Sequence, residues 1–175
     1  MIKILFVCHG NICRSTMAEY VMKYLVNQNG LEDKFFIDSA GTSTEEIGNP
    51  VHYGTRRKLE SVNIPDSVVK MEHRAFAYCP NLKSVVISNS IKTIDLFTFA
   101  GCKNLKSAVI PNGIEEIKKM AFGDCVNLET ITIPKTVKII EEAVFENCEK
   151  LTIHAPTGSY AEQYAKENNI PFVAE

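Results

Sequence analysis

The beginning of the chain combines continuous apolar runs with a helical apolar pattern. Ile2 to Val7 is apolar apart from Lys3, which predicts a buried parallel strand, and a second apolar run begins at Phe35. Between these runs, apolar side chains recur at helical spacing, at Met17, Tyr20, Val21, Tyr24 and Leu25. We predict a strand over 2–8, a helix over 15–28 that stops at Asn29-Gly30, and a second strand from 35. Together these elements form a right-handed parallel βαβ unit.

From about residue 62 the pattern changes, and similar residues return every 23 positions. The positions that keep this step are Phe76, Phe99, Phe122 and Phe145; Cys79, Cys102, Cys125 and Cys148; Leu82, Leu105, Leu128 and Leu151; Ile64, Ile87, Ile110 and Ile133; and Met71, Ile94, Ile117 and Ile140. A copy of this length cannot bury its own apolar face, so the copies must stack and share one core. We predict four copies over 62–157, each with a short parallel strand and with its Phe and Cys pointing inward.

Both ends of such a stack need a cover, because an open end exposes the core. Residues 158–169 are predicted to form a short helix whose one face carries Tyr160, Ala161, Tyr164 and Ala165, and a strand follows at 170–173. We expect 158–175 to be the C-terminal cap and 1–61 to cap the other end through one continuous core. Within the N-terminal module, we expect a polar loop over 41–50 and a short helix over 52–59.

The loop between the first strand and the helix, CHGNICRS at 8–15, has a cysteine at its start and an arginine near its end. Inward-facing backbone N–H groups at a helix N-terminus form an anion cradle, and an arginine adds a bidentate fork to two phosphate oxygens. The same positive field lowers the pKa of a cysteine and makes its thiolate a nucleophile. We predict a phosphate-binding loop made of Cys8, His9, Gly10, Asn11, Ile12, Cys13, Arg14 and Ser15.

This stretch resembles the phosphate-binding loop of low-molecular-weight protein tyrosine phosphatases. The likeness runs through FVCHGNICRS, MAEYVMKYLV, FFIDSAGTSTEEIGNPVH and GTRRKL, over about residues 1–60. The resemblance implies that Cys8 is the nucleophile that forms a cysteinyl-phosphate and that Arg14 binds the phosphoryl oxygens. It also implies that the Ser15 hydroxyl hydrogen-bonds the thiolate and that Asn11 and Ser39 support the loop.

The resemblance further implies that Cys13 forms a reversible protective disulfide with Cys8. Three departures are mild: His9 stands at a position that is apolar in many members, and Thr16 and Tyr53 replace prolines. The larger departure concerns length, because the family's domain is more than twice as long as the matching segment.

The sequence lacks the motif that carries the family's general acid. The family places it in an Asp-Pro loop, and this chain contains no Asp-Pro dipeptide. Asp66, Glu72 and Asp95 lie close enough in sequence to the junction to be candidates for a replacement. His73-Arg74 invites comparison with a His-Arg pair of the family, but it keeps the register of the repeats.

The second module resembles BspA-like leucine-rich repeats, whose members are solenoids with short parallel strands. Each copy reads approximately Ile-Pro-x-x-Val-x-x-Ile-x-x-x-Ala-Phe-x-x-Cys-x-Asn-Leu-x-x-x-x. The expected architecture is α/β: a truncated flavodoxin-like βαβ phosphatase fragment caps a leucine-rich-repeat solenoid with short parallel strands. Solenoid faces commonly bind proteins, so a protein partner on the repeat surface is possible.

Composition narrows the remaining choices. The chain is 45% hydrophobic and 23% charged with a net charge of −2, so it has no basic footprint for nucleic acid. It has no apolar run long enough to span a membrane, and we expect a cytoplasmic protein. Paired Cys-x2-Cys spacing is absent, so we expect the repeat cysteines to be core thiols rather than metal ligands or disulfides, and no metal or cofactor is predicted.

Two functions from different classes remain open. The first is a protein tyrosine phosphatase-like phosphomonoesterase that binds phosphate or sulfate, with weak or no turnover because the Asp-Pro acid loop is missing. The second is a non-enzymatic leucine-rich-repeat module that binds a protein, with the phosphatase fragment as a structural cap. An arsenate reductase is less favoured, since no further redox cysteines lie near the loop. The chain is expected to be a monomer or a swapped dimer.

Overall fold

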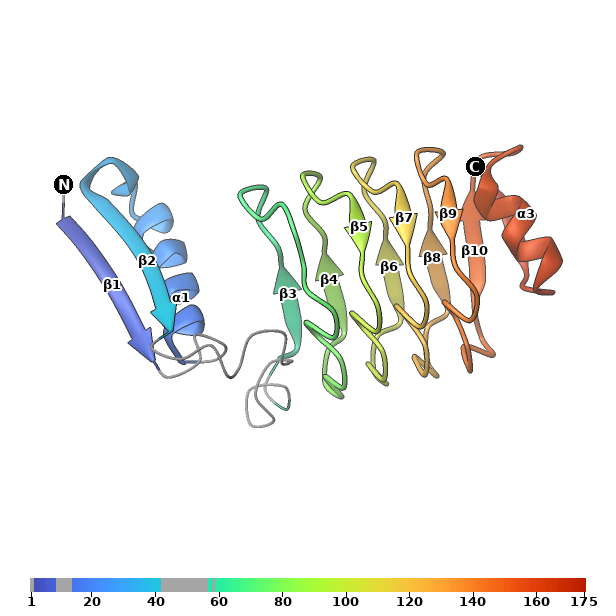
Figure 1. The fold of residues 1–175 in the computed structure, drawn as a ribbon, viewed down its shortest axis with the longest axis horizontal. Coiled ribbons are helices and arrows are strands. Elements are labelled where there is room, and N and C mark those ends of the chain that lie inside the picture. Colours follow the sequence, from blue (N-terminus) through green and yellow to red (C-terminus); the bar gives the residue numbers. More distant parts are fainter. Residues whose placement is uncertain (1, 9–13, 42–56, 58) are drawn as a thin grey trace. The chain divides into compact units, whose positions relative to one another are not determined.

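The computed structural model describes residues 2–8, 14–41, 57 and 59–175 of the 175-residue chain. The chain divides into two compact units, residues 1–52 and residues 53–175 (Figure 1). The predicted short helix over 52–59 falls almost entirely outside the described residues.

The N-terminal unit is a βαβ unit, as predicted. Strand β1 (Ile2–Cys8) leads to helix α1 (Arg14–Gln28), a 3-10 turn η1 (Glu32–Lys34) and strand β2 (Phe35–Gly41). The two strands run parallel, with Ile2 paired to Phe35 and Cys8 paired to Gly41. Helix α1 stops where the sequence predicts, because the Asn29 side chain donates to the Leu25 carbonyl (2.7 Å) and Gly30 takes φ +62°.

The apolar face predicted for α1 is wrong at the three members whose side chains the structure describes, and Met17 and Tyr20 lie outside the described side chains. Val21, Tyr24 and Leu25 are each about half exposed, at 50%, 58% and 48%, whereas Val26 is buried. Apolar residues of this helix occupy two neighbouring stripes, and helical periodicity alone does not choose between them. The helix contacts β1 and β2, and Val26 is the buried side chain among residues 21–28, the part of the helix whose side chains are described.

The second unit is a solenoid built from two parallel sheets. The first sheet has the order β11-β10-β8-β6-β4-β3, and the second has the order β5-β7-β9. The strands of the first sheet are β3 (Ser61–Asn63), β4 (Ser84–Val86), β6 (Ser107–Val109), β8 (Thr130–Thr132), β10 (Thr152–Ala155) and β11 (Phe172–Ala174). Those of the second are β5 (Thr93–Ile94), β7 (Glu116–Ile117) and β9 (Ile139–Ile140). The 23-residue period thus produces stacked parallel strands, as predicted (Figure 1).

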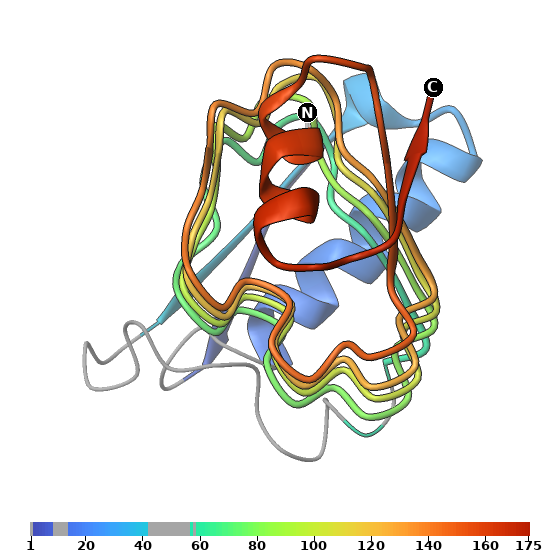
Figure 2. The same ribbon diagram turned by 90° about the vertical axis from the view of Figure 1, so that its right-hand side faces the viewer.

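The interior consists of ladders of identical residues. Viewed along the stack, the backbones of successive coils superimpose (Figure 2). The rings of Phe76, Phe99, Phe122 and Phe145 stack, with centroids 5.6, 5.2 and 5.8 Å apart. The four repeat cysteines are buried thiols, which confirms the prediction that they belong to the core.

The C-terminal cap forms from helix α3 (Tyr160–Glu167) and strand β11. Ser159 is its N-cap, and the serine Oγ accepts a hydrogen bond from the backbone N–H of Glu162 (3.2 Å). Ala161, Tyr164 and Ala165 are buried as expected, but Tyr160 is 40% exposed. The buried face of α3 therefore contains three of the four predicted residues. Tyr160 is not among them, because it lies in the first turn of this short helix.

The solenoid begins earlier than the four predicted copies. Strand β3 pairs with β4, Ser61 with Ser84, at the same step of 23 residues. Leu59 packs against the core and extends the leucine positions by one coil. The module boundary predicted between residues 61 and 62 lies inside β3, whereas the compact units divide between 52 and 53.

Candidate functional site

The predicted phosphate loop connects β1 to α1. Cys8 is the last residue of β1, and Arg14 and Ser15 open α1, so the backbone places the cysteine at a strand end and the arginine at a helix start. Ser39 lies in β2 opposite Phe6. The other residues of the predicted phosphate loop lie outside the described residues: His9, Gly10, Asn11, Ile12 and Cys13.

This strand–loop–helix order has a direct electrostatic consequence. The first N–H groups of a helix have no partner within the helix, and the helix dipole makes this end favourable for an anion. Helix α1 is 15 residues long and has no acidic residue in its first turn. Its start is therefore free of the negative charge that would compete with an incoming oxyanion.

Each of the three acid candidates has a structural partner inside the solenoid. The Asp66 carboxylate accepts a hydrogen bond from the Asn89 backbone N–H (3.1 Å). Glu72 pairs with Lys70 (2.8 Å) and Asp95 with Lys118 (3.3 Å). These contacts explain the three carboxylates as parts of the repeat surface.

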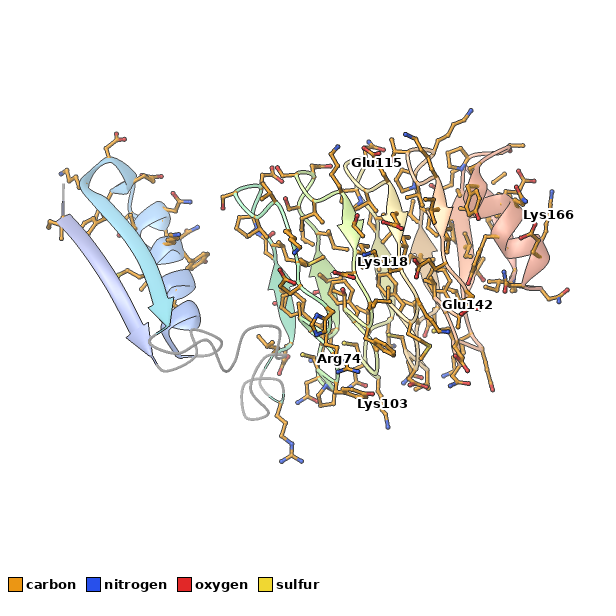
Figure 3. All side chains as sticks on the ribbon, in the orientation of Figure 1. Arg74, Lys103, Glu115, Lys118, Glu142 and Lys166 are labelled. Carbon is orange, nitrogen blue, oxygen red and sulfur yellow. The ribbon has the colours of Figure 1, made fainter. Side chains whose placement is uncertain are left out.

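Ion pairs join neighbouring coils along the outer surface of the solenoid. Glu115 lies between Lys92 (3.4 Å) and Lys138 (3.7 Å), which come from the coils before and after it. Lys119 bonds Glu142 (2.6 Å), an interaction that lowers the pKa of the carboxyl and raises the pKa of the ammonium. Figure 3 labels Glu115, Lys118 and Glu142. These ion pairs link equivalent positions of neighbouring coils. Because their charged groups are exposed to solvent, they do not form a reactive site.

The buried thiols are not nucleophiles. The Cys102, Cys125 and Cys148 Sγ atoms each lie 3.2 Å from the carbonyl oxygen of Phe76, Phe99 and Phe122, respectively, and donate to it. Burial raises the pKa of Cys125 to about 12 and that of Cys148 to about 11. A thiol of this kind stays protonated near neutral pH. These repeat cysteines therefore offer no nucleophile, and the nucleophile predicted at Cys8 lies outside the repeats.

The described parts of the chain hold neither a metal-binding cluster nor a membrane-spanning helix. There, histidine, cysteine and carboxylate side chains form no group of three or more that could hold a metal ion. In the same parts, no helix has the length and apolar character needed to cross a bilayer.

The sequence did not predict a cluster of exposed and half-buried side chains where the coils turn toward the first sheet. The turn cluster, as we call it, consists of Arg74, Tyr78, Leu96, Phe97 and Met120. In the repeat pattern these positions vary, so they carried no periodic signal. Four of them share φ values near +57°, a backbone feature that sequence periodicity does not reveal.

Comparison with known protein families identifies the repeats. A model described as the BspA type leucine rich repeat region matches residues 34–152 in six copies. Among solved structures, a leucine rich cell surface protein from Faecalibacterium prausnitzii A2-165 is 42% identical, with a TM-score of 0.57, over 61% of this chain and 28% of that chain. A leucine-rich repeat protein from Bacteroides ovatus is 34% identical, with a TM-score of 0.53, over 59% of this chain and 28% of that chain.

Curated relatives match a partial N-terminal stretch. The low molecular weight protein-tyrosine-phosphatase YfkJ of Bacillus subtilis is 52% identical over 64 residues, which is 37% of this chain and 41% of the relative. A low molecular weight phosphotyrosine protein phosphatase of Dictyostelium discoideum is 64% identical over 47 residues, or 27% of this chain and 26% of the relative. The chain thus spans less than half the length of these curated relatives.

Proposed function

Because the chain belongs to the BspA-type leucine-rich-repeat family and carries a stretch similar to low molecular weight tyrosine phosphatases, we propose that it is a phosphatase-derived oxyanion-binding protein with weak or no turnover. The observation that carries this proposal is the order of the N-terminal unit. Cys8 ends a strand and Arg14 begins a helix, in the stretch that is 52% identical to a tyrosine phosphatase.

Binding is the step for which the chain has every part. Backbone N–H groups at the start of α1 and the Arg14 guanidinium would hold the three non-bridging oxygens of a phosphomonoester. Their positive field favours the thiolate of Cys8. The Ser15 hydroxyl would donate a hydrogen bond to that thiolate.

Turnover needs one more group. The Cys8 thiolate attacks phosphorus, so that an S–P bond forms and the bond from phosphorus to the leaving oxygen breaks. Water then hydrolyses the cysteinyl-phosphate and releases inorganic phosphate. The leaving oxygen carries away negative charge unless an acid protonates it, and no Asp-Pro loop supplies that acid.

Calorimetric titration of the full-length chain with inorganic phosphate tests the binding step. We expect saturable binding at one site, lost in Arg14→Ala and retained in Lys103→Ala, which removes an exposed cation from the solenoid. If phosphate fails to bind, or if both variants weaken binding equally, the proposal is wrong.

A second candidate function is recognition of a protein by the repeats, with the N-terminal unit in a structural role. The turn cluster favours it, because exposed arginine, tyrosine and leucine side chains beside half-buried phenylalanine and methionine have the composition of an interface. This function would persist in Cys8→Ser, which separates it from phosphate chemistry.

A further inference from the structure

The turn cluster occupies a row of left-handed backbone positions. Arg74, Phe97, Met120 and Ala143 succeed one another at the same place in four coils, with φ of 58°, 56°, 57° and 55°. Left-handed positions favour glycine or asparagine, because any Cβ crowds the backbone there. Bulky side chains at such positions reduce stability, so their presence on an exposed turn points to a role other than folding.

A second left-handed row lies beside the first. It contains Tyr78, Gly101, Asp124 and Asn147, of which only Tyr78 is an unusual residue for this conformation. The Tyr78 ring lies over Gly101, where an added Cβ would come within 2.6 Å of a ring carbon. Tyr78 remains 57% exposed. The Tyr78 ring therefore occupies the space left by the missing side chain of Gly101, and more than half of the tyrosine remains exposed to solvent.

One side-chain contact, together with backbone hydrogen bonds between neighbouring coils, places these residues next to one another. The Arg74 guanidinium lies over the Phe97 ring, 5.2 Å from its centroid. The Arg74 backbone N–H donates to the Leu96 carbonyl (2.9 Å), and Leu96 is 38% exposed. The Phe97 backbone N–H donates to the carbonyl oxygen of Lys119 (3.3 Å), the residue that precedes Met120. An arginine stacked on an aromatic ring and flanked by leucine, tyrosine and methionine resembles a binding hot spot.

Arg74 carries the one charge among the five residues of the turn cluster. The carboxylates near it have partners of their own: Glu72 pairs with Lys70, Asp95 pairs with Lys118, and Asp124 accepts a hydrogen bond from the Asn147 side-chain amide (2.7 Å). In the described part of the chain, Arg74 has a cation–π contact but no ion pair with a carboxylate. Figure 3 labels Arg74 and Lys103, both exposed cations. The charge complementary to this surface is negative.

We propose that the turn cluster binds an acidic protein segment that carries a bulky aromatic residue. A carboxylate of the segment pairs with the Arg74 guanidinium, and its aromatic side chain packs against Phe97, Leu96 and Tyr78. This inference goes beyond phosphate binding at the N-terminal loop, and it does not depend on that function.

Fluorescence anisotropy with the full-length chain tests the proposal. The probe is a labelled heptapeptide with glutamates on both sides of one central phenylalanine. Two control peptides replace the phenylalanine by glycine or every glutamate by lysine. We expect saturable binding of the probe, weakened at least about tenfold in both controls and reduced by added salt. Equal binding of a control peptide, or no binding of the probe, would overturn the proposal.

Protein variants separate a binding role from a structural one. Phe97→Asn places a residue that tolerates φ +56° in the row, so we expect a higher Tm together with at least about tenfold weaker binding. Arg74→Glu reverses the exposed charge and should weaken binding to a similar extent without lowering Tm. Ala143→Asn, in the same row but outside the cluster, should leave binding unchanged. Loss of binding that always accompanies a lower Tm would show a structural role and refute the proposal.

Discussion

The Tyr164 ring meets the Phe145 ring edge-on, with centroids 6.0 Å apart and planes at 74°. The phenylalanine pairs before it are stacked, with planes between 6° and 24° apart. A stacked ring would present another face for a further coil, whereas an edge-on ring does not. Tyr164 of α3 thus ends the aromatic ladder and covers the last coil of the solenoid.

Truncating this ring should destabilise the solenoid. Tyr164 is 6% exposed, and removal of a buried aromatic side chain typically costs about 3 kcal/mol or more. We expect Tyr164→Ala to reduce the free energy of unfolding by about 3 kcal/mol in urea titrations, and Tyr164→Phe to reduce it much less. Tyr160→Ala, at a position 40% exposed on the same helix, should change it by under about 1 kcal/mol. Equal effects at the two tyrosines would contradict the role of Tyr164 as a cover.

The buried thiols should make the solenoid sensitive to alkali. In the folded chain the pKa of Cys125 is about 12, against 9.0 for a solvated thiol, so the unfolded chain loses this proton first as pH rises. The stabilising contribution is complete below pH 9 and is lost between pH 9 and the folded pKa. Its slope is about 1.4 kcal/mol per pH unit. Urea unfolding at pH 8, 9 and 10 should show a shallower decline for Cys125→Ala than for the unsubstituted chain. Parallel declines would show that this thiol is not responsible.

Thr136 has a buried hydroxyl that finds no hydrogen-bond partner in the described structure. Replacing such a group with an isosteric apolar one removes its desolvation cost. We expect Thr136→Val to raise the free energy of unfolding by about 1 kcal/mol, measured by urea denaturation. Thr136→Ser keeps the hydroxyl and should give no gain, and a loss of stability in Thr136→Val would mean that the hydroxyl is satisfied in solution.

Gly113 is required because the neighbouring coil leaves no room for a side chain. A Cβ at this position would collide with the Asn89 carbonyl oxygen. Backbone must move to accommodate it, so we expect Gly113→Ala to cost about 1–3 kcal/mol and to lower Tm in calorimetry. Ser90 occupies the equivalent position one coil earlier and already carries a side chain. Ser90→Ala should therefore be nearly neutral, and an equally mild Gly113→Ala would disprove the steric argument.

Catalytic turnover, if any, should depend strongly on the leaving group. A general acid typically contributes about 10²–10⁴-fold, and its absence matters little when the leaving group is already a stable anion. We expect slow hydrolysis of p-nitrophenyl phosphate, abolished in Cys8→Ser and Arg14→Ala, and far weaker action on phosphotyrosine peptides. Comparable rates on both substrates would instead indicate a replacement acid, which single substitutions of Asp66, Glu72 and Asp95 would locate.

Much of the architecture follows from the sequence alone. The 23-residue step places Phe99 over Phe122 and Cys102 over Cys125, because only stacking lets such short copies bury their apolar faces. The apolar run from Ile2 and the stop at Asn29-Gly30 likewise define the βαβ unit. In these cases a local pattern and the burial requirement lead to the same answer.

Other features were decided only by the tertiary structure. Periodicity cannot tell that Val26 becomes buried while Val21, Tyr24 and Leu25 stay exposed, because which stripe of a helix is covered depends on what packs against it. The left-handed positions of Arg74 and Phe97 depend on how each coil closes onto the next. The turn cluster is therefore invisible in a single copy, since it forms only when residues from three successive coils are stacked side by side.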